Sequence, residues 1–395
     1  MGFTFHNWLE PPHNREAFWA VREVTTTVPI RNASGRVHPL ASRPAALDDM
    51  PVPTADGLGR QPLSAHLAAT QCDAICVVRD GVVRYEWAAP SAPPHPGGRH
   101  LLMSVSKSMC ATVLGAAVGR GDLALGDRVG DLAPELTDTS VADATVRHLI
   151  DMTAGTDFVE DYLEYANPDS DAPVLEYDRQ ANYRPLARRP ALGVLRYFRE
   201  FGTARPHGAR FDYRSPLTNI VARVLELATG TPFVRLLERD LWEAIGAEHP
   251  ADIIVDHVGF PTIDGGISCS VRDLARFGMV HVEDGCVGGS CVVTPAWVED
   301  CATPDEVATR AWAAVPPDPA SRDIPRVTPV AYRNAWWIVE PGRTLTGLGI
   351  FGQFCWVDRP SRTVIARFST WPDAYPEPVS VACLRVMRAI ADGLD

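Results

Sequence analysis

The alternation of hydrophobic and polar residues predicts β-strands near both ends of the chain. Residues 74–87 (AICVVRDGVVRYEW) form two strand-like runs around Asp80-Gly81, the pair that a tight type I′ turn prefers. Towards the C-terminus, three more runs have the β-branched and aromatic composition of strands, and they span residues 332–339, 349–358 and 363–370. The pattern therefore predicts a hairpin at one end and three strands at the other.

The segment between these strands has the spacing of amphipathic helices and the residues that begin and end them. One helix is expected to begin near Ser104 and to stop at Gly121. A second is expected from Ser215-Pro216, which suit an N-cap and a first turn, to Gly230. Further helix starts are indicated at Thr231-Pro232, at Ser270 with Asp273 and at Thr294-Pro295, and a last helix is predicted over residues 380–394.

This order of strands, helices, strands and a last helix is typical of an α+β fold. We expect an antiparallel sheet built from both ends of the chain, flanked by helices, with an all-helical lobe inserted between the two halves. The expected boundaries place residues 1–108 and 255–395 in the sheet domain and residues 109–254 in the helical lobe.

Charge and composition narrow the classes of partner. The formal net charge is -12 and no basic run occurs, which disfavours nucleic acid because a phosphate backbone is bound through clustered Lys and Arg. No apolar run approaches the roughly 20 residues of a membrane span, and the first residues lack the basic start and apolar stretch of a secretory signal. The nine cysteines are scattered without a C-x-x-C pair, which suits a reducing compartment. We therefore expect a cytoplasmic protein that binds neither nucleic acid nor membrane.

Lysine is almost absent from the chain, because Lys107 is the one lysine among 37 basic residues. Arginine stays protonated at any working pH, whereas a buried lysine can lose its proton and act as a base. A position that kept lysine is therefore a candidate for proton chemistry. The count alone leaves an ordinary exposed lysine equally open.

The residues around Lys107 match the pattern S-x-x-K, with Ser104 as the serine. If this segment opens a helix, the two side chains lie on one face and the amine can reach the hydroxyl. A serine hydroxyl is a weak nucleophile until a base takes its proton, and a desolvated neutral lysine can do so. The helix start would also place backbone N–H groups near a negative charge that develops on a substrate oxygen. The pattern predicts a nucleophilic serine with lysine as its base.

Other motifs carry weaker chemical signals. Tyr213 precedes the cap at Ser215, and a tyrosine beside a cationic amine can have a lowered pKa and shuttle a proton, although an ordinary loop tyrosine is the alternative. Gly347, Gly349 and Gly352 fit G-x-G-x-x-G, but the segment continues as a strand, which argues against a nucleotide. We expect these glycines to leave room for a ligand against the sheet edge. No Cys/His cluster has zinc spacing, so no metal is expected, and no other cofactor is expected either. No G-x-S-x-G elbow occurs, so a Ser-His-Asp hydrolase has no support.

Taken in order, S-V-S-K, Y-R-S and the glycine-rich strand resemble the three-part signature of the serine β-lactamase and penicillin-binding superfamily. The segments RHLLMSVSKSMCATVLGA, VEDYLEYANP, GGISCSVRDLARFG and GLGIFGQFCWVDRPSRTVIARFSTWPD are similar to 6-aminohexanoate-dimer hydrolases and family VIII carboxylesterases. The resemblance runs from about residue 8 to the end. It implies a serine β-lactamase-like fold, with Ser104 as the acylated nucleophile, Lys107 as its base and Tyr213 as the proton relay. It further implies an oxyanion hole formed by the N–H groups of Ser104 and Ile350.

The resemblance also points to seven residues at pocket positions. The dimer hydrolases use a tyrosine in the E-D-Y segment to help amide cleavage and a tryptophan of the W-W pair to line the pocket. Two of the seven residues are aspartates, which would favour a substrate or acceptor that carries an amine. Equally, these two could be ordinary loop aspartates that cap backbone N–H groups. An arginine and a phenylalanine depart from the family pattern. The seven are Tyr162, Asp178, Arg214, Asp264, Trp336, Trp337 and Phe351.

The leading hypothesis is a hydrolase of small esters or linear amides that works through an acyl-enzyme. One alternative is an acyltransferase, in which an amine or alcohol displaces water and a pocket that excludes water favours transfer. Another is a non-catalytic penicillin-binding module. Gly347-Leu348-Gly349 stands where β-lactamases have Lys-Thr-Gly, so the cation that would hold a β-lactam carboxylate is absent. The expected partner is a small-molecule ester or amide, with an amine acceptor in the transferase case, and a homodimer is also considered.

Overall fold

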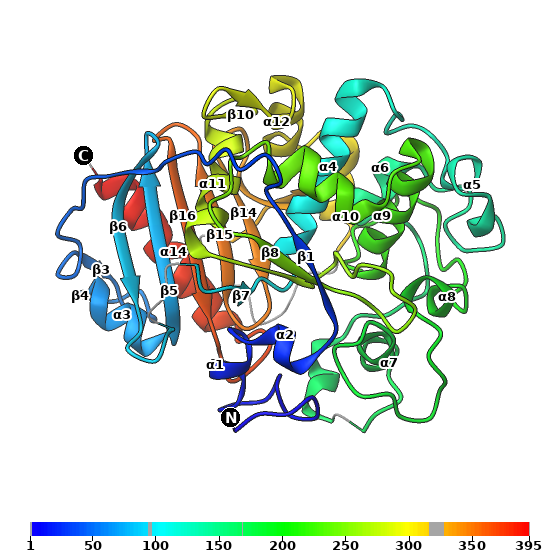
Figure 1. The fold of residues 1–395 in the computed structure, drawn as a ribbon, viewed down its shortest axis with the longest axis horizontal. Helices are drawn as coiled ribbons and strands as arrows, with labels where there is room; N and C mark the ends of the chain where they lie inside the picture. Colours follow the sequence, from blue (N-terminus) through cyan, green and yellow to red (C-terminus); the bar gives the residue numbers. More distant parts are fainter. Residues whose placement is uncertain (1, 94–96, 168, 316–327, 395) are drawn as a thin grey trace.

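A computed structural model describes residues 2–93, 97–167, 169–315 and 328–394, and its centre is an eight-stranded sheet built from both ends of the chain (Figure 1). Within this sheet neighbouring strands are antiparallel, except that β2 runs parallel to β6. In spatial order the strands are β12 (Ala331–Arg333), β13 (Trp336–Glu340), β14 (Thr344–Gly349), β15 (Gln353–Asp358), β16 (Thr363–Ser369), β5 (Cys72–Arg79), β6 (Val82–Ala88) and β2 (Ala41–Ser42).

The β5–β6 hairpin forms where the alternation predicts it. Asp80 and Gly81 have φ angles of 51° and 73°, as the two central residues of a type I′ turn require, and glycine reaches this region without a steric cost. Strand β5 is buried from Cys72 to Val78, because other elements cover both faces of the sheet at this strand. The prediction of a hairpin here is confirmed.

Two of the predicted C-terminal strands are wrong in extent. The run 332–339 is a hairpin of two strands, because Asn334 and Ala335 adopt φ angles of 47° and 58° and turn the chain between β12 and β13. The run 349–358 also contains a turn, in which Phe351 has a φ of 61°, so that β14 and β15 are separate strands. Large hydrophobic residues lie within two or three positions on both sides of each turn, and periodicity alone therefore does not reveal the turns.

Different helices cover the two faces of the sheet. On one face, α3 (Leu63–Ala69) and α14 (Glu377–Gly393) share a buried cluster with β5, β15 and β16. On the other face, α11 (Val271–Val282) packs against the same three strands. Helix α11 begins at the predicted cap, where the side chain of Ser270 accepts the N–H of Asp273.

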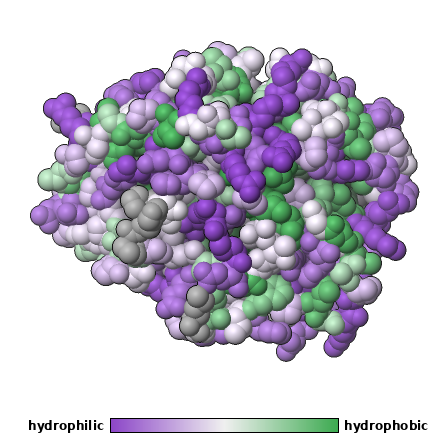
Figure 2. Space-filling model, in the orientation of Figure 1, coloured by the Kyte–Doolittle hydropathy of each residue, from purple (hydrophilic) through white to green (hydrophobic). Residues whose placement is uncertain are grey.

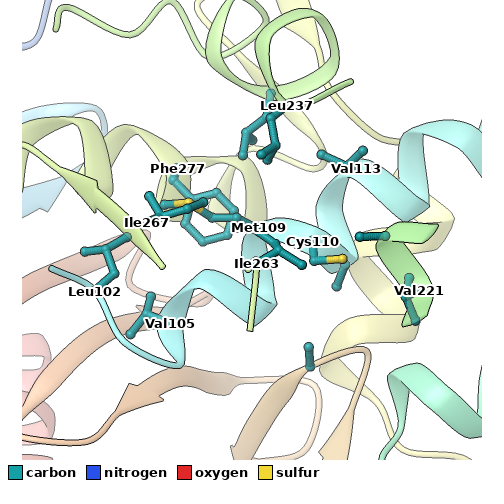
Figure 3. Packing of buried hydrophobic residues seen from close by; sticks show 14 of the residues in the cluster. Leu102, Val105, Met109, Cys110, Val113, Val221, Leu237, Ile263, Ile267 and Phe277 are labelled. Carbon is teal, nitrogen blue, oxygen red and sulfur yellow. The ribbon is translucent and has the colours of Figure 1, made fainter. Parts of the chain in front are cut away.

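The middle of the chain folds into helices that pack around α4 (Val105–Arg120). The predicted stop Gly121 follows α4 with a φ of 79°. Side chains of α4 pack against Val221 of α9, Leu237 and Phe277 (Figure 3). The other helices of this part are α5 (Val129–Leu132), η1 (Pro134–Leu136), α6 (Val146–Ile150), η2 (Tyr162–Ala166), α7 (Pro173–Gln180), α8 (Val194–Phe198), α9 (Pro216–Thr229), α10 (Phe233–Leu236) and the π-helical η3 (Leu237–Trp242).

A second, four-stranded sheet was not predicted from the sequence. Its strands have two to four residues, which is too short for an alternation signal. Strand β7 ends just before Ser104, and the loop between β8 and β9 carries Asp264, so this sheet positions two parts of the candidate site. In spatial order the strands are β1 (Thr27–Ile30), β8 (Ala251–Ile254), β9 (Ile267–Cys269) and β7 (His100–Leu101), all antiparallel.

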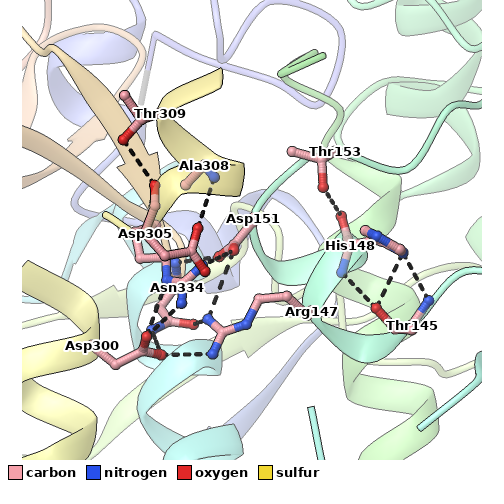
Figure 4. A network of polar contacts seen from close by, with 11 residues as sticks. Thr145, Arg147, His148, Asp151, Thr153, Asp300, Asp305, Ala308, Thr309 and Asn334 are labelled. Atoms are coloured by element: carbon pink, nitrogen blue, oxygen red, sulfur yellow. Dashed lines mark hydrogen bonds and ion pairs between the residues drawn. The ribbon is translucent and has the colours of Figure 1, made fainter. Parts of the chain in front are cut away.

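A buried polar network joins the helical middle of the chain to the C-terminal strands (Figure 4). Arg147 is the second residue of α6 and Asp151 directly follows this helix. Asp300 lies in α12 (Pro295–Ala302), and Arg333 ends β12. Arg333 donates to Asp151 at 2.9 Å, and Arg147 donates to Asp300 at 2.7 Å. Removing one partner of a buried ion pair leaves an uncompensated charge and costs about 3–5 kcal/mol. The network therefore fixes the start of β13 relative to the helices.

The face of the molecule drawn in Figure 2 is mostly hydrophilic, with smaller apolar patches between the polar ones.

Seven cysteines are buried free thiols, whereas Cys286 and Cys291 form a disulfide across the hairpin of β10 (Cys286–Val287) and β11 (Ser290–Cys291). This pair departs from the expectation of unpaired cysteines. Within the described ranges, every helix is too short or too polar to cross a membrane.

Candidate active site

Ser104 lies at the start of α4, directly after a turn in an uncommon backbone conformation. Met103 has a φ of 47°, in the left-handed region that residues other than glycine seldom adopt. The turn takes the chain from β7 straight into the helix, so that Ser104 occupies the N-cap position. Its side chain does not cap the helix and instead lines a pocket.

Lys107 lies one helical turn after Ser104, and its amine contacts the serine hydroxyl. Lys107 Nζ is 2.8 Å from Ser104 Oγ, and it donates to the carbonyl oxygen of Asp264 at 2.5 Å. The side chain is 1% exposed. Burial lowers the pKa of Lys107, although the carboxylates of Asp264, Glu160 and Asp178 oppose this effect. A neutral amine carries a lone pair, so the geometry presents a base to the Ser104 hydroxyl.

Tyr213 lies against the same two side chains. Its hydroxyl is hydrogen-bonded to the side chain of Ser104, and its ring centroid is 5.1 Å from Lys107 Nζ. The ring stacks on Trp337 with 5.5 Å between centroids and 22° between planes. Burial, followed by the charge of Glu160, raises the pKa of Tyr213 well above 10. The expectation of a lowered tyrosine pKa is therefore wrong, and the phenol keeps its proton at neutral pH.

The glycine-rich strand β14 lies directly against the start of α4. A Cβ atom at Gly349 would be 2.5 Å from the carbonyl oxygen of Leu102, and one at Gly347 would be 3.2 Å from Ser108 Oγ. The expectation that these glycines leave room for a ligand is wrong, because the chain's own helix start fills that space. The close approach instead brings Ile350, the next residue along, to the pocket.

The turn after β14 is held by Gln353, whose side chain is fully buried. Its amide donates to the carbonyl oxygens of Phe351 at 3.2 Å and Ser369 at 2.6 Å, and its side-chain oxygen accepts the N–H of Ser369. The backbone N–H of Phe351 donates to Ala374 at 2.7 Å. These bonds hold Phe351 in its positive-φ conformation. Ile350 and Phe351 both line the pocket.

The pocket beside Ser104 is small, with a volume of about 40 Å³. This space exceeds the minimum of ~10–15 Å³ that a single water molecule needs, so water can enter the pocket. Only a small chemical group fits without movement of the wall. Aromatic hydroxyls and one leucine make up much of that wall, namely Leu9, Tyr162, Tyr165, Tyr177 and Tyr183.

Three carboxyl groups, from Glu160, Asp178 and Asp264, also line this pocket. Burial raises the pKa of Asp178 and of Asp264 to about 6. Arg184 donates to Asp178 at 3.3 Å and Asn219 donates to Asp264 at 2.9 Å. Both aspartates therefore ionise close to neutral pH, and an ammonium group in the pocket would favour their charged forms. In the part of the chain that the structure describes, no three His, Cys, Asp or Glu side chains are grouped to hold a metal ion.

Glu160 was not singled out from the sequence. Its carboxylate accepts hydrogen bonds from the Tyr162 hydroxyl at 2.6 Å, the Ser215 hydroxyl at 2.7 Å and the Ser215 N–H at 2.5 Å. It thus links the E-D-Y segment to the loop that carries Tyr213. Its position two residues before Tyr162 was the available signal.

A second, larger pocket of about 500 Å³ adjoins the first. Leu9, Tyr162, Tyr165 and Phe351 line both pockets and therefore form the wall between them. The outer pocket is the only one of the two large enough for an extended chain. Its remaining wall comes from residues 10–11, from Leu163, Ala166 and Arg184, and from residues 372–376.

The structure does not bring every predicted substrate residue to these pockets. Arg214 is buried behind the site and donates to the carbonyl oxygen of Phe158. Trp336 is fully buried and stacks on a phenylalanine of α11. Contrary to expectation, neither lines the pocket, and Trp337 reaches the site through the ring of Tyr213. The predicted residues that do line the inner pocket are Tyr162, Asp178, Asp264 and Phe351.

The β-lactamase family pattern matches residues 63–382, a span that contains Ser104, Lys107 and Tyr213. The chain belongs to the β-lactamase family. A curated relative in this family, the 6-aminohexanoate-dimer hydrolase of Paenarthrobacter ureafaciens, is 34% identical over 376 residues, which cover 94% of this chain and 88% of the relative. The match to a named hydrolase and to the family makes this chain a β-lactamase-fold serine hydrolase.

Solved structures of β-lactamase-family proteins share the fold. A Bacillus anthracis protein named after 6-aminohexanoate-dimer hydrolase aligns with a TM-score of 0.85 and 21% identity, covering 99% of this chain and 97% of that one. A family VIII carboxylesterase aligns with a TM-score of 0.57 and 13% identity, covering 82% and 96%. These likenesses confirm the predicted serine β-lactamase-like fold, whereas the domain boundaries at residues 108 and 255 stay a prediction.

Proposed function

We propose that this enzyme hydrolyses small linear amides or esters through an acyl-enzyme on Ser104. One observation carries the proposal: Lys107 Nζ lies 2.8 Å from Ser104 Oγ, in a site where burial lowers the lysine pKa. The amine contacts a hydroxyl and a backbone carbonyl instead of a carboxylate. This environment suits a base that must be neutral before each cycle.

In the acylation step, Ser104 Oγ attacks the carbonyl carbon of the substrate while Lys107 takes the hydroxyl proton. The resulting oxyanion would be stabilised by the backbone N–H groups of Ser104, at the start of α4, and Ile350, after β14. Tyr213 keeps its proton at neutral pH and donates it to the leaving amine or alcohol. Lys107 then returns its proton to Tyr213. The C–N or C–O bond breaks, and an ester remains on Ser104.

In the deacylation step, the same groups act on water. A water molecule loses a proton to Lys107 and attacks the ester carbonyl, the bond between the acyl carbon and Ser104 Oγ breaks, and Oγ takes that proton from Lys107. The free acid departs and the starting protonation state returns. Because the three side chains are in contact, they titrate as one coupled unit.

The pocket supports a substrate with an amine at one end. The inner pocket of about 40 Å³ accepts only a small group, and Asp178 and Asp264 in its wall favour a cation. The rest of a linear substrate would extend into the outer pocket of about 500 Å³. The name of the Paenarthrobacter relative specifies a dimer of 6-aminohexanoate, a compound that carries an amine, which agrees with a subsite for an amine.

A matched substrate series tests the proposal. Each p-nitrophenyl ester of an ω-amino acid would be assayed beside the analogue in which a methyl group replaces the ammonium group. We expect the aminated ester to have a kcat/KM about 10–100-fold higher, as for a charged hydrogen bond worth ~1.5–3 kcal/mol. In Asp178→Asn this ratio should fall towards one. Equal rates for both members of every pair in the wild type would contradict the amine subsite.

Acyl transfer is a second candidate function, because the inner pocket has room for few water molecules. Adding primary amines during ester turnover separates the two functions. An amide product formed at the expense of free acid supports transfer, and an unchanged yield of acid supports hydrolysis. A stable adduct with a fluorescent penicillin, without turnover of any ester, would instead support a penicillin-binding module.

We also propose a cytoplasmic location, which the seven buried free thiols support. A fusion to a reporter that fluoresces only in the cytoplasm would test it.

A further inference from the structure

Asn219 lies near the start of α9, behind the candidate base, and the mechanism above does not use it. The side chain is 1% exposed. Its Nδ2 donates to Asp264 Oδ1 at 2.9 Å and to the Tyr177 hydroxyl at 2.5 Å. Its Oδ1 accepts the backbone N–H of Asp264 at 3.2 Å. Two of its three hydrogen bonds therefore hold one residue, Asp264.

Asp264 is also the residue that holds Lys107. Its carbonyl oxygen accepts a hydrogen bond from Lys107 Nζ at 2.5 Å. It lies in the loop between β8 and β9, and its N–H is bound by a side chain of α9 instead of by the loop itself. When the N–H and the carboxyl group of a residue are both held, its Cα atom and carbonyl carbon are fixed in place, and only rotation about the Cα–C bond remains free for the carbonyl oxygen. Asn219 thereby restricts the position of the oxygen that holds the amine.

The same contacts keep the Asp264 carboxylate away from the amine. Its Oδ1 faces Asn219 Nδ2 and the Tyr183 hydroxyl, at 2.9 Å and 3.5 Å. A carboxylate turned onto Lys107 would form an ion pair and favour the protonated amine. A backbone carbonyl carries no net charge, so it can orient the amine with much less cost to its neutral form.

We propose that Asn219 is a positioning residue, which fixes both the N–H and the carboxyl group of Asp264 and so directs the Lys107 amine at Ser104 with an uncharged oxygen as its partner. The inference rests on the proposed function, since a lone pair on Lys107 matters only where Ser104 must lose a proton.

Several other groups act on the same amine. Besides Asp264, they are the carboxylates of Glu160 and Asp178, the thiol of Cys110 and the ring of Tyr213. None of these four residues is substituted in an Asn219 variant. A change in Lys107 protonation in an Asn219 variant that adds no charge of its own is therefore expected to come through Asp264.

The single lysine of the sequence gives a direct measurement. Protein labelled with 15N at Nζ and 13C at Cε of lysine, without lysine in any tag, yields one side-chain NMR signal, from Lys107. We expect the midpoint of its pH titration to rise by about one pH unit in Asn219→Ala, because the Asp264 carboxylate can then approach the amine. In the pH dependence of kcat, the midpoint of the acid side should shift to higher pH by a similar amount. At its optimum pH, kcat for an ester should fall about 10–100-fold, as for misplaced catalytic groups, with KM within about twofold.

Two further variants separate positioning from a general loss of structure. Asn334 is also a buried amide, and it hydrogen-bonds Arg147 and Asp300 in the network of Figure 4. Asn334→Asp should lower the unfolding temperature and leave the Lys107 midpoint unchanged. The double variant Asn219→Ala with Asp264→Asn has no carboxylate at position 264, so its Lys107 midpoint should not exceed that of the wild type.

The outcomes distinguish the inference from the proposed function. An unchanged Lys107 midpoint in folded Asn219 variants overturns the inference, even where Ser104-dependent acylation is intact. A raised midpoint in Asn219→Ala that persists in the double variant also overturns it. Failure of the wild type to form an acyl-enzyme contradicts the proposed function, whatever the titration gives. Unfolding temperatures identify the folded variants, and Asn219→Ser, which keeps an oxygen acceptor, carries the test if Asn219→Ala unfolds.

Discussion

Replacement of Lys107 by methionine should remove activity and leave the protein folded. Methionine has nearly the volume of lysine and carries no proton to exchange. A positioned general base contributes about 10²–10⁴-fold to rate, so kcat/KM should fall by that factor, which corresponds to ~3–5 kcal/mol of transition-state stabilisation.

Stability should change little, because two effects of this substitution oppose each other. Burial lowers the pKa of Lys107, so the folded protein binds this proton less tightly than the unfolded chain does. Below the ordinary lysine pKa of 10.5, the buried amine therefore costs stability that an apolar side chain does not cost. Against this gain, the Asp264 carbonyl loses its donor, which costs about 1–3 kcal/mol. We expect the free energy of unfolding near neutral pH to lie within about 2 kcal/mol of the wild-type value.

Ester turnover, acyl-adduct formation and urea unfolding of the same preparation test this prediction. Lys107→Arg is the matched control, because arginine keeps the positive charge and cannot release its proton. It should be as inactive as Lys107→Met and less stable, since a larger cation must be buried. A folded Lys107→Met that retains more than about a tenth of wild-type kcat/KM would refute the assignment of Lys107 as the base.

Three further predictions concern the pocket and its supports. Asp178 and Asp264 have pKa values raised to about 6, so their carboxyl groups are neutral below that pH and charged above it. The KM for an aminated ester should therefore fall as the pH rises through about 6. The KM for the methyl analogue should stay constant in the same assay. Gly349→Ala places a Cβ atom 2.5 Å from the Leu102 carbonyl oxygen, so the free energy of unfolding measured by calorimetry should fall by about 1–3 kcal/mol, and kcat should also fall. An unchanged unfolding temperature would contradict the close packing. Tyr162→Phe keeps the ring and loses the hydroxyl, and it should slow an amide more than an ester of the same acyl group in parallel kcat measurements; equal slowing would remove the special role in amide cleavage.

The parts of the site that the sequence predicted are those fixed by local geometry. Ser104 and Lys107 are one helical turn apart, so the S-x-x-K spacing alone places the amine beside the hydroxyl. The hairpin at Asp80-Gly81 and the helix stop at Gly121 follow in the same way from backbone preferences of single residues. Short-range rules of this kind do not depend on the rest of the fold.

The parts that the sequence did not predict depend on contacts between distant segments. Asn219 and Asp264 are 45 residues apart and meet only because α9 packs beside the β8–β9 loop. Leu9 reaches the pocket wall through the path of the N-terminal arm, which carries no periodic signal. Arg214 adjoins Tyr213 in sequence, yet its side chain is buried away from the pocket. The position of Arg214 next to Tyr213 in the sequence therefore did not predict where its side chain lies.

Acylation of Ser104 can be observed by intact-protein mass spectrometry during turnover of a short p-nitrophenyl ester. We expect a burst of p-nitrophenol and an adduct of the acyl mass on the peptide that contains Ser104, with neither in Ser104→Ala. Folded wild-type protein that turns over the ester without an adduct, or a folded Ser104→Ala variant that does so at the wild-type rate, would contradict it.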